Sequence, residues 1–253
     1  MDLLLLGLVL GMANALLAVG LVLIFMSGRI LNFAHGEFGA FAVSMMIMLV
    51  GRYHWPYWPS LALSLLATAA LGATVERTIM SRFQRSPRVI ALLATIGVAQ
   101  ILIAVRLALP KPKVEGGEAT LFGGAGSFPV PFHSGQFTFG RVVLGPAHLM
   151  VLVVGPVLAL GVAWFLRSSI YGLSIRAAAE NASRARLVGI PVHRVSTLAW
   201  VVSALLAGVA AILLAPVVGY TASEAVGLPL LMHGLAAATI ARFESVAEAF
   251  GWG

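Results

Sequence analysis

The segment from Arg29 to Phe38 brings a cation, an amide, an imidazole and a carboxylate together between two apolar runs. If those runs cross a bilayer, Asn32, His35 and Glu37 are candidates for lining a path through it, because ionisable groups at membrane depth usually face a cavity or a partner. His35 and Glu37 would point to different faces of a helix, so a broken or re-entrant turn suits them better. A structural alternative stays open for Glu37, since a carboxylate stabilises the first turn of a helix.

Catalytic and metal chemistry have little support in the sequence. The chain has no Cys and lacks the G-x-x-x-x-G-K-[ST] loop, the G-x-S-x-G elbow and the H-E-x-x-H motif. A metal needs three or four converging ligands, and His35 and Glu37 have no obvious third. We therefore assign no catalytic residue, metal or cofactor to this chain.

Two alternative functions stay open for His35 and Glu37. They could form a proton relay in a stand-alone secondary transporter or, less favoured, act as acid–base groups of an intramembrane enzyme.

A second polar segment, from Gly172 to Pro191, has the pattern of a short, rigid, amphipathic helix. Its Ala-rich middle favours helix, and Gly189 provides a stop with Pro191 just beyond it. The small apolar face consists of Ile175, Ala178, Ala182 and Ala185. Another face carries Arg176, Glu180 and Arg184 at the spacing of weak ion pairs. Because the apolar face lacks the large side chains that lipid insertion needs, we expect this helix to fit a groove of a partner protein.

The composition of the chain predicts the kind of fold that holds these two polar segments in place. Hydrophobic residues make up 60% of the 253 residues and charged residues only 10%, whereas a soluble domain carries roughly 25% charged residues. We therefore predict an all-α, polytopic transmembrane helix bundle with about seven segments. The apolar runs are Leu3–Met26, Gly36–Val50, Trp58–Val75, Val89–Leu109, Ala147–Leu166, Ser196–Gly219 and Val226–Ile240. The second and the last are short, so each is expected to be tilted, broken or re-entrant.

The basic residues predict how the bundle is oriented. Eleven of them fall on one side if the seven runs alternate, mainly in the connections that follow the third and fifth runs, and four fall on the other. By the positive-inside rule the N-terminus is external and both Arg-rich connections are cytoplasmic. The net charge of +7 therefore reflects topology in an inner (plasma) membrane, not nucleic-acid binding. Arg106, the only Lys or Arg well inside a run, is expected to extend to the external surface.

The domain organisation expected from these features is one transmembrane domain over residues 1–253. It has a cytoplasmic segment at 167–195 and an external loop at 110–146. The loop is rich in Gly and Pro, and Gln136–Phe139 alternates like a short strand. It is either a solvated connector or a docking surface for an external partner.

Several groups of residues give the chain a resemblance to a known family. They are Arg-Ile-Leu-Asn-Phe-Ala-His-Gly-Glu-Phe at 29–38, Glu76-Arg77, Arg85-Ser86-Pro87, Ala94-Thr95-Ile96-Gly97, and Arg-Ala-x-Ala-Glu-Asn…Gly-Ile at 176–190. In this order, and over almost the whole chain, they resemble the permeases of ABC importers for branched-chain amino acids, the leucine/isoleucine/valine type.

The resemblance implies a pore subunit that is not itself an enzyme. It implies a second, similar permease, two cytosolic ATPase subunits that bind ATP and Mg²⁺, and a soluble binding protein outside. It further implies that the second polar segment couples the pore to an ATPase, with these candidate residues: Arg176, Glu180, Asn181, Arg184 and Gly189. The family's usual cargo is branched-chain amino acids, and related permeases carry other amino acids, amides or urea.

The C-terminal region departs from the family pattern. Ala241-Arg242-Phe243-Glu244-Ser245 stands where the family usually shows a Gly-Gly-x-Gly-Ser-like turn, and the chain ends at Gly253, where one more helix is expected. We therefore predict a truncated or frame-altered C-terminus.

Overall fold

Residues 2–83, 86–110, 128–131, 137–139, 142–218, 226–243 and 245–253 are described by the computed structural model, and most of them are helical. The longer helices are α1 (Asp2–Gly28), α3 (Tyr57–Val75), α5 (Arg88–Ala108), α6 (Pro146–Ser168), α7 (Ile170–Leu187) and α8 (Val192–Val218). The shorter helices are α2 (His35–Ile47), α4 (Ser81–Phe83), α9 (Gly227–Ile240) and α10 (Val246–Trp252). Two π-helical segments, Met48–Arg52 and Glu76–Met80, continue α2 and α3.

The predicted helix bundle is confirmed, and each of the seven apolar runs forms a helix. Within the described residues, five helical stretches are long and apolar enough to cross a membrane. They are Leu6–Gly28, Tyr57–Phe83, Arg88–Ala108, Pro146–Ser168 and Val192–Val218. The two short runs became α2 and α9, which have 13 and 14 residues. A 14-residue helix is about 21 Å long, less than the roughly 30 Å of a bilayer core.

The helices divide into a central group and a peripheral group. In their most apolar windows, α1 is 67% buried and α8 is 61% buried, whereas α3, α5 and α6 are each 28% buried. Glycines allow close approach to α8, since an added Cβ at Gly72 would come within 2.8 Å of Ala204 and one at Gly208 within 3.2 Å of Ala42. The peripheral helices therefore turn most of their apolar surface outward.

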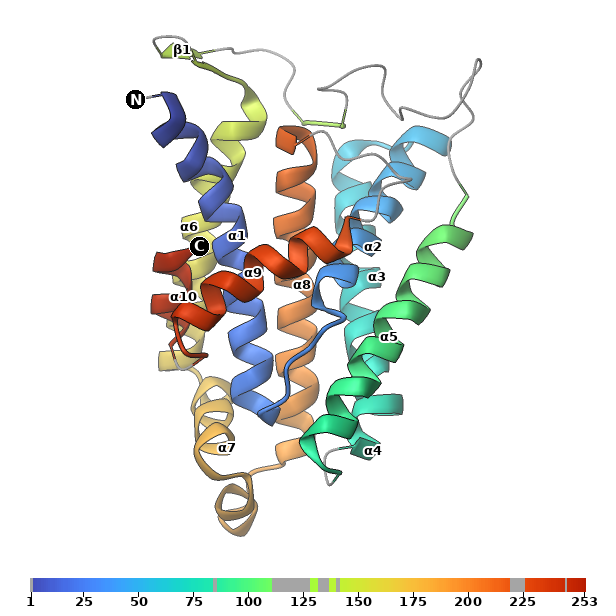
Figure 1. The fold of residues 1–253 in the computed structure, drawn as a ribbon. Coiled ribbons are helices and arrows are strands. Elements are labelled where there is room, and N and C mark those ends of the chain that lie inside the picture. The colour runs from blue at the N-terminus through green and yellow to red at the C-terminus, as the bar shows by residue number, and fades with distance from the viewer. Residues whose placement is uncertain are drawn as a thin grey trace.

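Helix α2 starts in the middle of the bundle. After α1 ends at Gly28, the chain turns at Arg29, whose φ is 54°, and runs back without helical structure to His35 (Figure 1). From there α2 continues to the end of the bundle where α1 began (Figure 1). The predicted re-entrant feature is confirmed as this return segment, and His35 and Glu37 lie in the first helical turn after it.

Helix α9 lies obliquely across the bundle and packs against α1 and α2 (Figure 1). The alternation predicted for all seven runs therefore does not extend to α9, because this helix is too short to cross. The short helix α10 follows it and packs against α1.

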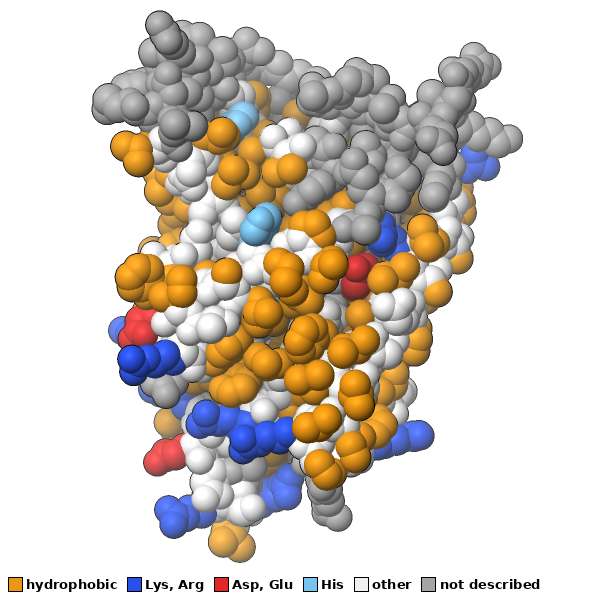
Figure 2. Space-filling model, in the orientation of Figure 1, with side chains coloured by type: hydrophobic (Ala, Val, Ile, Leu, Met, Phe, Trp, Pro, Cys, Tyr) orange, Lys and Arg blue, Asp and Glu red, His pale blue; other side chains and the backbone are white. Residues whose placement is uncertain are grey.

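The two Arg-rich connections lie at the same end of the bundle. Helices α4 and α7 occupy that end in Figure 1, and Lys and Arg side chains gather there beneath a broad hydrophobic band in Figure 2. The opposite end carries the antiparallel hairpin of β1 (Phe137–Phe139) and β2 (Val142–Leu144), with Phe137 paired to Leu144. The strand predicted at 136–139 is confirmed for 137–139, while Gln136 and most of the loop at 110–146 lie outside the described residues.

Candidate functional site

Two side chains satisfy part of the backbone of the return segment. The Oδ1 of Asn32 accepts a hydrogen bond from the Ala34 N–H at 3.0 Å. The Oγ1 of Thr95, on α5, accepts one from the Phe33 N–H at 3.2 Å and donates to the Leu92 carbonyl at 2.7 Å. Such partners are needed because non-helical backbone at membrane depth has no water to bond. Asn32, which is buried, therefore shapes the turn before α2.

His35 lies in the core between three helices. Its side chain is fully buried, and its Nδ1 lies 3.1 Å from the Ser203 hydroxyl on α8. A Cβ at Gly20 would come within 2.6 Å of the imidazole Cε1, so α1 accommodates the ring only because residue 20 is glycine. The imidazole thus joins the start of α2 to α1 and α8. Its predicted place on a translocation path stays a prediction.

Glu37 points to the opposite side of α2, as the spacing predicted. Its Oε2 lies 3.7 Å from the Arg106 Nε on α5, and both side chains are buried. The carboxylate also lies against Gly227, the first residue of α9, where an added Cβ would overlap it. A carboxylate at a helix N-terminus is stabilised by the helix dipole. Glu37 therefore connects α2, α5 and α9.

The expectation that Arg106 extends to the external surface is wrong. Arg106 is 6% exposed and pairs with Glu37. The carboxylate provides a partner for the guanidinium inside the bundle, so Arg106 does not have to reach water. This pair could not be predicted from the sequence, because the two residues lie on different apolar runs.

The predicted coupling segment forms α7, but it is not one rigid helix. Asn181 has φ −156° and ψ 102°, which interrupts the helix. Its Oδ1 accepts hydrogen bonds from the Ser183 and Arg184 N–H groups, each at 3.0 Å, so it caps the second half of α7. Gly189 has φ +82°, which confirms the predicted stop.

The two predicted faces of α7 are partly confirmed. Ile175, Ala178 and Ala185 are buried against the bundle, and the side chain of Ala182 lies outside the described set. Arg176, Glu180 and Arg184 are exposed. Among the described residues no ion pair joins these three, and the break at Asn181 changes the spacing of Glu180 and Arg184.

The break in α7 leaves the Ala179 carbonyl free to accept a hydrogen bond from Arg29, the residue after α1. In a continuous helix the Ala179 carbonyl would accept from the Ser183 N–H, which is instead bonded to Asn181. The Arg29 guanidinium donates to that carbonyl through Nε at 3.3 Å and Nη2 at 3.1 Å. Arg29 also lies over the Phe25 ring, 5.7 Å from its centroid. The segment before α2 is thereby attached to α7.

A polar cluster around Glu76 was missed by the sequence reasoning. Glu76 is fully buried; its Oε2 accepts from the Thr197 hydroxyl at 2.6 Å, and its Oε1 lies 3.3 Å from the His193 Nδ1. His193 and Thr197 are one helical turn apart on α8. That spacing was the available signal, but it did not indicate a partner in the π-helical segment after α3.

Comparisons with known proteins agree with the earlier resemblance. A family model described as "Branched-chain amino acid transport system / permease component" matches residues 3–251. The permease protein BraD of Pseudomonas aeruginosa, described as part of a high-affinity branched-chain amino acid transport system, is 28% identical over 97% of this chain and 84% of its own length. LivH of Escherichia coli K12, with the same description, is 29% identical over 82% of this chain and 68% of its own length.

A third relative, a LivH-type protein of Methanocaldococcus jannaschii described as a probable branched-chain amino acid transport permease protein, is 27% identical over 77% of this chain and 60% of its own. No solved structure matches the chain. The match over nearly the whole length, together with the helical bundle, identifies an integral membrane protein and a transport component rather than an enzyme. The chain belongs to the family of branched-chain amino acid transport system permease components.

Proposed function

We propose that this chain is a membrane-spanning subunit of an ATP-driven importer that carries branched-chain amino acids. The observation that carries the proposal is α7, which presents exposed Arg176 and Arg184 at one end of the bundle and is hydrogen-bonded to Arg29 at the end of α1. An exposed cationic helix that is also hydrogen-bonded to the rest of the bundle suits a subunit whose conformation is changed by a partner protein.

The proposed orientation has the N-terminus outside and α4 and α7 in the cytosol. Its support is the common location of the two Arg-rich connections, because basic residues are retained on the cytoplasmic side. The end of the bundle that carries β1 and β2 then faces outward, where a soluble binding protein would deliver the cargo. The opposite end would meet two ATPase subunits, which bind ATP and Mg²⁺.

The proposed pore also needs a second permease subunit. The mostly outward-facing helices α3, α5 and α6 give apolar surface both for this subunit and for lipid. Asn32, His35 and Glu37 remain the candidates for residues near the path. In this conformation they are buried, so their exposure would require movement of the return segment.

The proposed coupling route runs from α7 to α2. An ATPase that shifts the first half of α7 displaces the Ala179 carbonyl, and Arg29 follows because its guanidinium holds that carbonyl. Arg29 directly precedes the return segment, whose other end is fixed to Thr95 and to the core through His35. Movement at the cytosolic end therefore reaches the polar start of α2.

Charge reversal of the exposed arginines tests the proposal. The double substitution Arg176→Glu and Arg184→Glu is expected to lower coupled uptake at least about tenfold, because two interface charges become repulsive. The measurement is uptake of labelled leucine and ATP hydrolysis by the complete importer in vesicles. Arg52→Glu, also exposed but at the opposite end of the bundle, serves as the matched control.

Unchanged coupled uptake in the double variant would contradict the role given to α7. Uptake by the chain alone under a proton gradient, without ATPase subunits, would contradict the proposed importer and favour a stand-alone transporter. If labelling of a cysteine introduced at Arg184 occurred only from the external side, the orientation would be wrong.

A further inference from the structure

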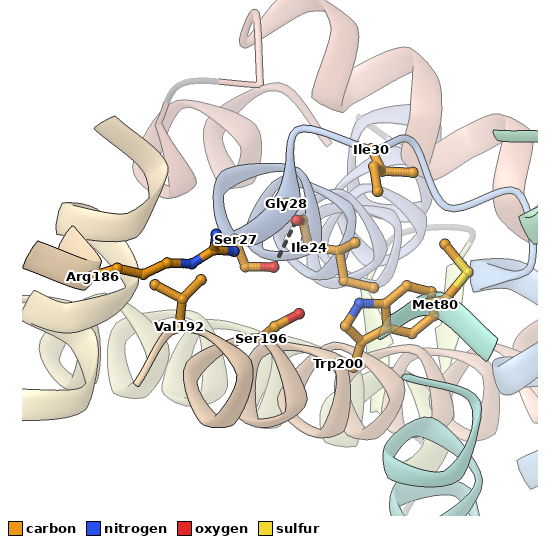
Figure 3. A pocket seen from close by; sticks show the side chains of 9 residues that line it. All are labelled: Ile24, Ser27, Gly28, Ile30, Met80, Arg186, Val192, Ser196 and Trp200. Atoms are coloured by element: carbon orange, nitrogen blue, oxygen red, sulfur yellow. Dashed lines mark hydrogen bonds between the residues drawn. The ribbon is translucent and has the colours of Figure 1, made fainter. Parts of the chain in front are cut away.

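A cavity of about 90 Å³ lies between α1 and α8 at the end of the bundle that carries α7. Its walls come from α1, the return segment, the π-helical segment after α3, the second half of α7 and α8 (Figure 3). The lining residues are Ile24, Ser27, Gly28, Ile30, Met80, Arg186, Val192, Ser196 and Trp200. On this measure about 10–15 Å³ already holds one water, so the space accommodates a small organic molecule.

The apolar part of the wall is well buried. Ile24, Met80 and Trp200 are each 2–4% exposed, and Val192 is 7% exposed. Branched and thioether side chains of this kind favour a short, branched apolar group, which gains from leaving water.

The polar part of the wall consists mainly of donors without partners. Ser196 is 6% exposed, its hydroxyl points into the cavity in Figure 3, and no hydrogen bond to it is found in the described part of the chain. The Trp200 indole N–H likewise has none there. The Arg186 guanidinium extends toward the same space (Figure 3). These donors line the cavity, so a ligand there that accepts hydrogen bonds would pair with them.

The charge of the wall selects an anion. None of the described residues that line the cavity is acidic, and Ser27 already donates its hydroxyl proton to the Ile24 carbonyl at 2.9 Å. A second, more open cavity of about 660 Å³ shares Arg186 and Val192 and adds Arg82, Ser81 and His193. The larger cavity is therefore lined by several cationic side chains, whereas the smaller one is lined mainly by apolar side chains.

We propose that this cavity binds a short branched-chain carboxylate without an amino group. The carboxylate lies between Arg186 and Ser196, and the branched end lies against Ile24 and Met80. An α-amino acid is disfavoured because its ammonium group would enter a cationic site that offers no carboxylate. This site is separate from the path candidates, since neither cavity includes Asn32, His35 or Glu37.

A bound anion would join the second half of α7 to α1 and α8, because Arg186 belongs to α7 and Ser196 to α8. The proposed ligand is the deaminated form of the proposed cargo, a product of transamination. Its binding would make the position of α7 depend on the concentration of that product. This last step rests on the proposed function, whereas the binding itself does not.

Binding is tested with the purified full-length chain in nanodiscs. The probes are labelled 4-methyl-2-oxopentanoate, 4-methylpentanoate, leucine and acetate, measured by equilibrium binding. The two branched carboxylates are expected to bind at one site per chain, and leucine and acetate at least about tenfold more weakly. Arg186→Gln and Ser196→Ala are expected to weaken binding, Arg186→Gln by about tenfold or more. Arg194→Gln, an exposed arginine outside both cavities, is the matched control.

Absence of saturable binding by the unaltered chain would overturn the proposal, and this result does not depend on any variant folding. Equal binding of leucine would overturn the selection against the amino group, and equal binding of acetate would overturn the role of the apolar wall. Unchanged binding in a folded Arg186→Gln chain would place the ligand elsewhere. None of these results bears on ATP-driven uptake, so the proposed function is tested independently.

Discussion

At the scale of single residues, the energetics of the bundle depend on a few buried polar groups that meet across helices. The Glu37–Arg106 pair is the clearest example, since both side chains are nearly inaccessible and their charged atoms lie 3.7 Å apart. Removing one member of such a pair typically costs 3–5 kcal/mol, because the other charge is left buried. Gly227 makes the pair possible by leaving space for the carboxylate.

Gly227→Ala is expected to destabilise the chain by about 1–3 kcal/mol, because the new methyl group overlaps the Glu37 carboxylate. The measurement is the melting temperature in detergent. Gly97→Ala is the matched control, since a Cβ there meets nothing within 4 Å. In a Glu37→Ala background the cost of Gly227→Ala should largely disappear. Equal costs in both backgrounds would show that the carboxylate is not what occupies this space.

The turn after α9 provides a second prediction for a single residue. Arg242 has φ 53° and Phe243 has φ 56°, in the left-handed region that glycine tolerates best. Phe243 packs against Phe25 with ring centroids 4.9 Å apart, whereas Arg242 is exposed.

Arg242→Gly is therefore expected to raise stability by about 0.5–1 kcal/mol, the relief of left-handed strain less the added entropy of the unfolded chain. The control is Arg194→Gly on helix α8, which should lower the melting temperature because glycine weakens a helix. A drop in both variants would argue against strain at Arg242.

At the scale of elements, α7 consists of two helical halves joined at Asn181. The two halves make different contacts. In the first half the Ala179 carbonyl accepts a hydrogen bond from Arg29, and in the second half Arg186 lines the cavity. The sequence predicted the helix, its buried face and its stop at Gly189. It did not predict the break, because a mid-helix Asn is compatible with either a continuous helix or a cap.

Asn181→Ala is expected to straighten α7. Without the Oδ1 acceptor, the Ser183 N–H gains most by bonding the Ala179 carbonyl, which then leaves Arg29. The chain has no native Cys, so spin labels at Tyr171→Cys and Leu187→Cys report the distance by pulsed electron resonance. It should lengthen toward about 24 Å, the length of a straight 16-residue span. Asn181→Asp keeps the cap and should leave the distance unchanged, and the same distance in all three chains would contradict this account.

At the scale of the whole molecule, the apolar runs carry most of the fold and say little about its polar contacts. Seven runs predicted seven helices, and the short lengths of two of them predicted that α2 and α9 would not cross simply. The contacts that position the candidate residues join distant parts of the chain, as in Thr197 to Glu76, 121 residues apart. Such pairs depend on how helices pack, which hydropathy does not encode.

The burial of Glu37 and Arg106 against each other has a consequence for biosynthesis. The two residues are 69 positions apart, so at 5–20 residues per second the acid is translated about 3–14 s before its cation. Until α5 arrives, a lone carboxylate in α2 faces an insertion penalty of about 2.5–3.5 kcal/mol at membrane depth. This penalty weakens the insertion of α2 on its own, so we expect its stable position in the bundle to depend on the later arrival of α5.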